Sequence, residues 1–258
     1  MAVRLEVLGP AGGAPLGGAC PSYVVFGARA TVLLDCGPGA VERLWARGLL
    51  PRLDAVVISH PHMDHVLDLL PLSGSVVRPH LGDHRRPPLH VPRGAGEVLR
   101  ALDRAFGGRS GAPTRFDAAF DVREYDARDR VEVGDLTLTF APTEHAQPCF
   151  AARVTDGDGV LVYGADGGPS DAVAGLAEGA DVLVLEATFL DDEATAAQYG
   201  HMTAGQAGAL AARAGARRLL LTHLMPGADP DALARRAAEH FPGPVDVARE
   251  GLVVSVLT

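Results

Sequence analysis

The sequence predicts an α/β protein in which helices and β-sheets form a layered sandwich. Short β-rich runs are followed by helical segments in both halves of the 258-residue chain. Several of these runs are apolar throughout instead of alternating, which is typical of strands that are covered on both faces. Because 47% of the residues are hydrophobic, a large core can form without disulfides, and we expect a single domain over residues 1–258.

The first third of the chain is expected to consist mainly of strands. Gly and Pro clusters at 9–18 and 37–39 separate the β-rich runs. A helix is expected at 38–45, where apolar residues repeat at helical spacing after the initial proline. The expected strands of this part are residues 3–8, 23–26, 31–35 and 55–59.

The second half is expected to show the same order of strands followed by helices. Between the halves, the segment 78–130 is rich in Arg, Pro and Gly, and we expect it to form a variable insertion or lid with one helix at 96–106. The expected elements of the second half are strands at 131–140, 150–155, 160–163, 182–186 and 219–222 and helices at 171–178, 203–214 and 230–240.

The charge balance argues against a nucleic-acid-binding surface. Lys and Arg together number 23, and Asp and Glu number 32, which gives a net charge of −9. All of the basic residues are Arg, and they form no basic run or tail. Nucleic-acid binding depends on neutralising phosphates with a basic face, so we expect no stable nucleic-acid complex.

Cysteine usage and hydropathy predict a cytoplasmic protein. The three cysteines, Cys20, Cys36 and Cys149, are an odd number without CxxC spacing, and the N-terminus carries no basic and apolar leader. The longest apolar runs are far shorter than the roughly 20 residues that span a bilayer, so we expect no contact with a membrane.

The densest group of chemically active side chains is the segment His60-Pro61-His62-Met63-Asp64-His65, directly after an apolar strand. Three histidines and one aspartate at the end of a strand would cost stability if they were buried without partners. We therefore interpret the segment as part of a metal site. The alternative is a polar loop that merely opens a helix at 66–70.

Three further candidates occur in the same local context. His145, Asp166 and His223 each follow a predicted strand. Strand ends at one edge of a layered α/β fold converge on a crevice, which is the usual place for a site. We therefore expect these residues to join the histidine-rich segment.

The seven candidate ligands exceed the four that one tetrahedral metal takes. His60 and His62 lie two residues apart in extended chain and can share one metal, whereas the next two ligands begin a helix and point elsewhere. The count closes if Asp166 bridges two metals, with His60, His62, His145 and Asp166 at one and Asp64, His65, His223 and Asp166 at the other. Imidazole and carboxylate ligands suit two Zn²⁺ ions, with Mn²⁺ or Fe as alternatives, and such a pair activates water for hydrolysis.

These motifs resemble the metallo-β-lactamase superfamily. Its HxHxDH motif stands here at residues 60–65, and its later ligand positions match His145, Asp166 and His223. The resemblance extends from residues 8–9 to residues 221–224. It implies a four-layer αββα sandwich with two mixed β-sheets and a dinuclear site at one edge.

Two other segments resemble the phosphodiesterase branch, which includes ribonuclease Z and small cyclic nucleotide phosphodiesterases. They are Glu186-Ala187-Thr188-Phe189 and the segment 200–207, which begins Gly-His-Met-Thr. In this branch the corresponding Glu and His lie beside the scissile phosphate.

The resemblance therefore implies that Glu186 and His201 are catalytic, and we add Asp64 to the catalytic set. His201 also precedes Thr203, an expected helix N-cap whose surroundings favour anions. The alternative is that His201 only caps this helix and that Glu186 only anchors a loop.

The implied activity is metal-dependent hydrolysis of a small phosphodiester, and we predict a 3′,5′-cyclic nucleotide as the substrate. The alternatives are tRNA 3′ processing, opening of a lactone or other ester, and a metal-binding protein without activity. The Gly-rich arm with which ribonuclease Z grips tRNA has no counterpart, because the interval 182–201 is too short and 78–130 lacks a basic cluster beyond Arg85 and Arg86. Relatives in this branch are often dimers, which leaves a homodimer open.

Overall fold

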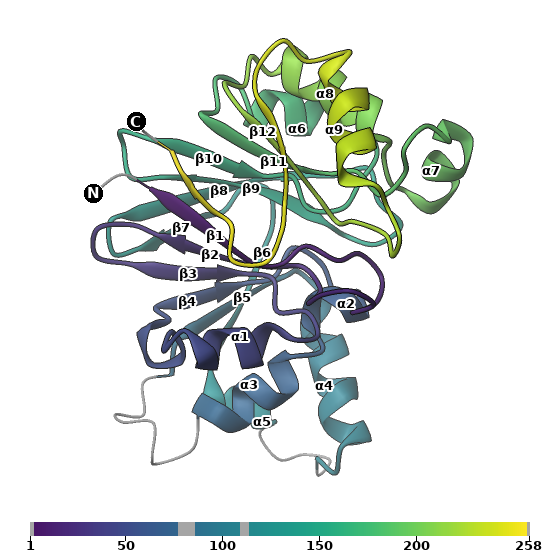
Figure 1. Cartoon of the computed structure of the whole chain (residues 1–258). Coiled ribbons are helices and arrows are strands. Elements are labelled where there is room, and N and C mark those ends of the chain that lie inside the picture. Colours follow the sequence, from purple (N-terminus) through teal and green to yellow (C-terminus); the bar gives the residue numbers. More distant parts are fainter. Residues whose placement is uncertain (1–2, 77–85, 109–113, 257–258) are drawn as a thin grey trace.

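The computed structural model describes residues 3–76, 86–108 and 114–256. Figure 1 shows two β-sheets packed face to face, with one set of helices beneath the first sheet and another above the second. The predicted four-layer αββα sandwich with two mixed sheets is therefore confirmed.

The first sheet contains seven strands in the order β14-β1-β2-β3-β4-β5-β6. The pairings from β14 to β3 are antiparallel, and those from β3 to β6 are parallel. Its strands are β1 (Arg4–Gly9), β2 (Ser22–Phe26), β3 (Thr31–Leu34), β4 (Ala55–Val57), β5 (Pro88–Pro92), β6 (Asp121–Tyr125) and β14 (Val253–Ser255).

The second sheet also contains seven strands, in the order β13-β12-β11-β10-β9-β8-β7. The pairings from β7 to β10 are antiparallel, and those from β10 to β13 are parallel, so both sheets are built on the same plan. Its strands are β7 (Arg130–Val133), β8 (Leu136–Pro142), β9 (Phe150–Thr155), β10 (Val160–Tyr163), β11 (Val182–Glu186), β12 (Leu219–Thr222) and β13 (Val245–Val247).

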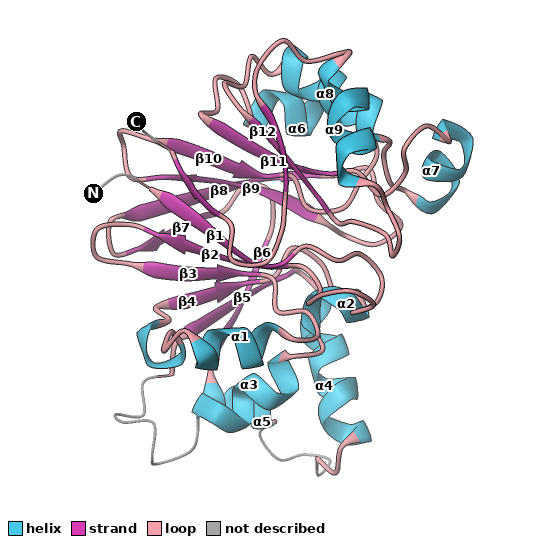
Figure 2. Cartoon of the chain, viewed as in Figure 1, coloured by secondary structure: helices cyan, strands magenta, loops and turns pink. Residues whose placement is uncertain are grey.

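Helices form the two outer layers, as Figure 2 shows in cyan. None of the helices in the described ranges combines the length and the apolar character needed to cross a membrane. The helices of the first half are α1 (Ala40–Ala46), the 3₁₀ turn η1 (Leu50–Arg52), α2 (Met63–Val66), α3 (Leu69–Val76), α4 (Ala95–Ala105) and α5 (Arg115–Ala119). Those of the second half are α6 (Asp171–Leu176), α7 (Glu193–Tyr199), α8 (Ala204–Arg213) and α9 (Pro230–Ala238).

Three apolar clusters fill the spaces between the four layers. Strand β11 shows how one strand serves two of them. Val182 and Val184 face the opposite sheet, whereas Leu183 and Leu185 pack with the residues of α6, α8 and α9. A strand that is buried on both faces has no polar side, which explains its continuous apolar sequence.

Within the segment 78–130, predicted to be a variable insertion or lid, α4 lies where the helix at 96–106 was predicted. Residues 77–85 and 109–113 lie outside the described residues, but β5 and β6 extend the first sheet, and α4 and α5 pack against them. The strand pattern was missed because β5 begins and ends with proline and because most side chains of β6 are at least partly exposed. The predicted strand 131–140 is also two strands, since Gly134, with a φ of 60°, turns the chain between β7 and β8.

Candidate metal centre

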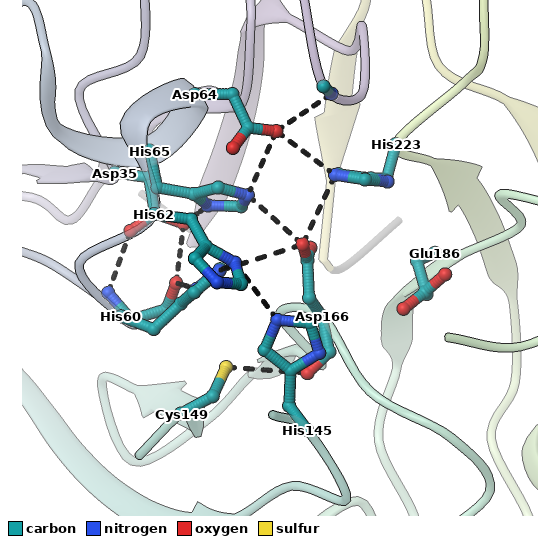
Figure 3. A network of polar contacts seen from close by, with 12 residues as sticks. Asp35, His60, His62, Asp64, His65, His145, Cys149, Asp166, Glu186 and His223 are labelled. Carbon is teal, nitrogen blue, oxygen red and sulfur yellow. Dashed lines mark hydrogen bonds and ion pairs between the residues drawn. The ribbon is translucent and has the colours of Figure 1, made fainter. Parts of the chain in front are cut away.

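The predicted site residues meet at the edge of the sandwich where the parallel strands end. His60 follows β4, Asp166 follows β10, and His223 follows β12, so both sheets contribute ligands. His145 lies in the turn after β8. Figure 3 shows these side chains pointing toward one another, with Asp166 between those of the two halves.

The first group consists of His60, His62, His145 and Asp166, whose donor atoms all lie within 4.8 Å of one another. Nδ1 of His62 lies 3.0 Å from Nε2 of His60 and 3.1 Å from Nε2 of His145. Oδ2 of Asp166 lies 3.6 Å from Nε2 of His60. Three ring nitrogens and one carboxylate oxygen therefore surround one point.

The second group consists of Asp64, His65 and His223, again with donor atoms within 4.8 Å of one another. Oδ2 of Asp166 also reaches this group, since it lies 3.3 Å from Nε2 of His65 and 3.1 Å from Nε2 of His223. One oxygen of Asp166 thus adjoins both groups. The structure brings all seven predicted ligands close together, and Asp166 and His223 form a third such set with His201.

A buried carboxylate that was not among the predicted site residues, that of Asp35, orients two histidines from the first half of the chain. Asp35 Oδ2 accepts hydrogen bonds from Nδ1 of His65 at 2.7 Å and from Oγ of Ser59 at 2.8 Å. Nδ1 of His60 lies 3.0 Å from the same Ser59 oxygen. With both Nδ1 atoms used in this way, the lone pairs of Nε2 face the centre. The available signal was the position of Asp35 directly after an apolar strand.

Glu186 ends β11 and belongs to neither group of candidate ligands. Its Oε1 accepts from Nδ1 of His201 at 2.8 Å and from the backbone N–H of Gly167 at 2.7 Å. The His201 ring lies 5.2 Å from the rings of both His145 and His223, measured between centroids. Glu186 therefore holds His201 beside the centre.

Electrostatics divide the histidines into two kinds. Burial lowers the pKa of His60 and of His62, which favours their neutral forms. Burial also opposes charge on His65 and His223, but nearby carboxylates, above all Asp166, outweigh it and raise the pKa of both, that of His223 to about 10. These carboxylates thus favour positive charge at the centre, which bound protons or a metal ion can provide.

The donor atoms fit divalent metal ions. Nε2 of His65 is buried and makes no hydrogen bond within the described part of the chain, although Oδ2 of Asp166 lies 3.3 Å away. A cation between these two atoms would satisfy both of them. Neutral imidazole and carboxylate are ligands that zinc, manganese and iron share, so this cluster is able to bind metal ions.

Backbone strain is concentrated around the same cluster. Only Asp35, Ala165 and His223 combine a side chain with a positive φ among the described residues, with values of 56°, 55° and 54°. The carbonyl of Asp166 accepts from Oγ1 of Thr143 at 2.6 Å and from Sγ of Cys149 at 3.3 Å. Such conformations persist where surrounding contacts enforce them, as they do next to functional groups.

Substitution of Gly12 by alanine is expected to disturb the second group. A Cβ atom at this position would lie 2.5 Å from Nδ1 of His223, and the ring would have to move. We expect metal affinity to fall about 10–100-fold, the size typical of disturbed ligand support. A chelator competition assay measures this, with Gly175→Ala as the control, because a Cβ atom there meets nothing within 4 Å. Unchanged affinity in Gly12→Ala would contradict the expected tight contact.

Comparisons with known proteins agree with this geometry. Residues 30–224 match the family described as "Beta-lactamase superfamily domain". The chain is 32% identical to the probable metallo-hydrolase YhfI of Bacillus subtilis (strain 168), with 97% of this chain and 99% of that protein aligned. The crystal structure of YhfI superposes with a TM-score of 0.86 at 31% identity and covers 98% of each chain.

Two further comparisons extend the relationship. Ribonuclease Z of Methanopyrus kandleri is 31% identical, with 92% of this chain and 91% of that protein aligned. A diphosphatase from the PhnP family shares the fold with a TM-score of 0.78 at 20% identity, covering 98% of this chain and 97% of that one. Because these matches span nearly the whole sequence, the chain belongs to the β-lactamase superfamily, as a metal-dependent hydrolase of its ribonuclease Z-like branch.

Proposed function

We propose that this hydrolase binds two zinc ions and cleaves a small phosphodiester, with a 3′,5′-cyclic nucleotide as the expected substrate. The observation that carries the proposal is the pair of ligand groups that share Asp166, with His201 held beside them by Glu186. Two bound zinc ions would supply the charge that polarises a phosphoryl group and lowers the pKa of an attacking water.

The residues of the chain would perform the remaining tasks. His201 keeps its Nδ1–H on Glu186, at 2.8 Å, so that its Nε2 can donate a proton to the leaving oxygen when the ring is protonated. The carboxylate fixes the orientation of the ring and also accepts from the backbone N–H of Gly167. Asp64 is fixed by the backbone N–H of Gly13, which donates to Oδ2 at 2.8 Å, and would keep the second group in place during turnover.

A small substrate fits the charge around the site better than a polyanion does. A short connecting segment between Glu186 and His201 contains α7, which Figure 1 shows projecting from the side of the molecule. Asp191, Asp192 and Glu193 precede or begin this helix, and all three are exposed. Asp191 is paired with Arg236, but the net charge of −9 would repel tRNA, whereas two metal ions can neutralise the single phosphate of a cyclic nucleotide.

Processing of tRNA 3′ ends is the second candidate, because ribonuclease Z of Methanopyrus kandleri is 31% identical over most of the chain. The hydrolase relatives contradict the third alternative, a metal-binding protein without enzymatic activity. Ester or lactone opening would use the same metal groups, so only the substrate that is turned over distinguishes it from cyclic nucleotide hydrolysis and tRNA processing.

A panel assay with the zinc-loaded protein tests the proposal. We expect hydrolysis of 3′,5′-cyclic AMP and little or no 3′ cleavage of precursor tRNA at physiological salt. A His62→Ala preparation, purified in parallel, should be inactive and controls for contaminating enzymes. The reverse pattern would assign the protein to tRNA processing, and turnover of a lactone alone would contradict the phosphodiesterase assignment.

A further inference from the structure

Two buried carboxylates, one from each half of the fold, support the candidate metal centre in the same way. Asp35 follows β3 of the first sheet, and Glu186 ends β11 of the second. Each receives one imidazole Nδ1 directly, from His65 at 2.7 Å and from His201 at 2.8 Å. Each also accepts from a side-chain hydroxyl: Asp35 from Ser59 and Tyr163, and Glu186 from Thr188.

In the second half that hydroxyl belongs to Thr188. Its Oγ1 lies 2.5 Å from Oε2 of Glu186 and 2.8 Å from Nδ1 of His223. A hydroxyl has one proton, and the charged carboxylate is the stronger acceptor for it. The oxygen of Thr188 is then left to accept the Nδ1–H of His223.

This direction of hydrogen bonding decides which nitrogen of His223 can bind a metal. With the proton on Nδ1, the lone pair of Nε2 points toward Oδ2 of Asp64 at 3.3 Å and Oδ2 of Asp166 at 3.1 Å. Thr188 is 8% exposed and Glu186 is 1% exposed, so water has little access to replace the hydroxyl. Ser59 occupies the equivalent place between Asp35 and His60 in the first half.

We propose that Thr188 is a positioning residue for His223, through which the single carboxylate of Glu186 sets both the second metal group and His201. Glu186 would then matter for metal binding although it contacts none of the seven candidate ligands. The inference rests on the proposed function only for the part played by His201. The effect of Thr188 and Glu186 on metal binding by His223 can be measured without a substrate.

Thr188→Val is the decisive variant, because valine keeps the shape of threonine and has a methyl group in place of the hydroxyl. Nδ1 of His223 then has no acceptor, and we expect metal affinity at the second group to fall about 10–100-fold. Thr188→Ser restores the hydroxyl and should restore most of the affinity. Zinc titration of the metal-free protein against a chelator measures both, with Thr137→Val as a matched substitution near the start of β8, at the end of that strand remote from His145.

Two further measurements distinguish the hydrogen-bond chain from Glu186 through Thr188 to His223 from a general packing defect. Imidazole ¹H–¹⁵N spectra of the zinc-loaded protein should contain an Nδ1–H signal of His223 that Thr188→Ser keeps and Thr188→Val loses or shifts. Glu186→Gln should also weaken metal binding, and its effect should be less than additive with that of Thr188→Val, since both act through one chain of hydrogen bonds.

Wild-type affinity in Thr188→Val, or equal weakening in the serine and valine variants, would overturn the inference. So would an unchanged Nδ1–H signal in Thr188→Val. Failure of the proposed function looks different, because a protein that is inactive on phosphodiesters would still show the metal affinities and spectra expected here.

Discussion

Replacing Asp166 with alanine is expected to empty both metal groups and to slow hydrolysis by at least about a thousandfold. Its Oδ2 atom lies 3.1 Å from Nε2 of His223, 3.3 Å from Nε2 of His65 and 3.6 Å from Nε2 of His60. No other described carboxylate oxygen is recorded in contact with imidazoles of both groups. Removal of Asp166 therefore takes a ligand from both groups at once, together with the one negative charge that they share.

The matched comparison for Asp166→Ala is His65→Ala, which removes a ligand of the second group only. Elemental analysis of the purified variants should show that Asp166→Ala loses both ions. His65→Ala should keep the ion of the first group. Circular dichroism shows whether each variant is folded. Two ions retained at full occupancy in Asp166→Ala would refute the shared role of this residue.

Replacing His201 with alanine is expected to leave both metal ions bound and to lower turnover about 10²–10⁴-fold, the usual cost of losing a general acid or an oxyanion donor. The ring is held by Glu186 through Nδ1, so its other nitrogen is available to a substrate. The seven residues of the two groups already supply ligands for two ions without His201. Metal content and turnover, measured on the same preparation, show whether His201 takes part in the reaction or in metal binding.

His240→Ala is the control for this variant, because His240 is an exposed histidine next to the end of α9. It should keep full metal content and full turnover. Asp166, His201 and His223 also form a set whose donor atoms lie within 4.8 Å of one another. Loss of an ion in His201→Ala would therefore make His201 a ligand and remove it from the proposed proton transfer, as would wild-type turnover.

Sequence reasoning found the candidate ligands because their signal is local. His60, Asp166 and His223 each follow an apolar run, and strand ends in such a fold share one edge. Asp35 stands in the same context, but a single aspartate after a strand has no partner in the nearby sequence. Its contact with Ser59 joins the ends of the neighbouring strands β3 and β4, and its contact with Tyr163 reaches the second sheet, so both depend on the tertiary fold.

The fold class was predictable for a similar reason, and the missed elements show the limit. Strands such as β10 and β11 are short apolar runs, which a pattern of residues can reveal. Strand β6 lies at a sheet edge with polar, exposed side chains, and β13 and β14 have only three residues each. Their structure comes from pairing with neighbours that are distant in the chain, which no local pattern contains.

The pairing of β1 with β14 has a consequence for how the protein matures during translation. Arg4 stands opposite Ser255, so about 250 residues must be made before the outer edge of β1 finds its partner. At about 5–20 residues per second, the ribosome leaves that edge uncovered for roughly 12–50 s. An unpaired strand edge is a template for aggregation, so nascent chains should depend on chaperones until β14 has been made and has paired with β1.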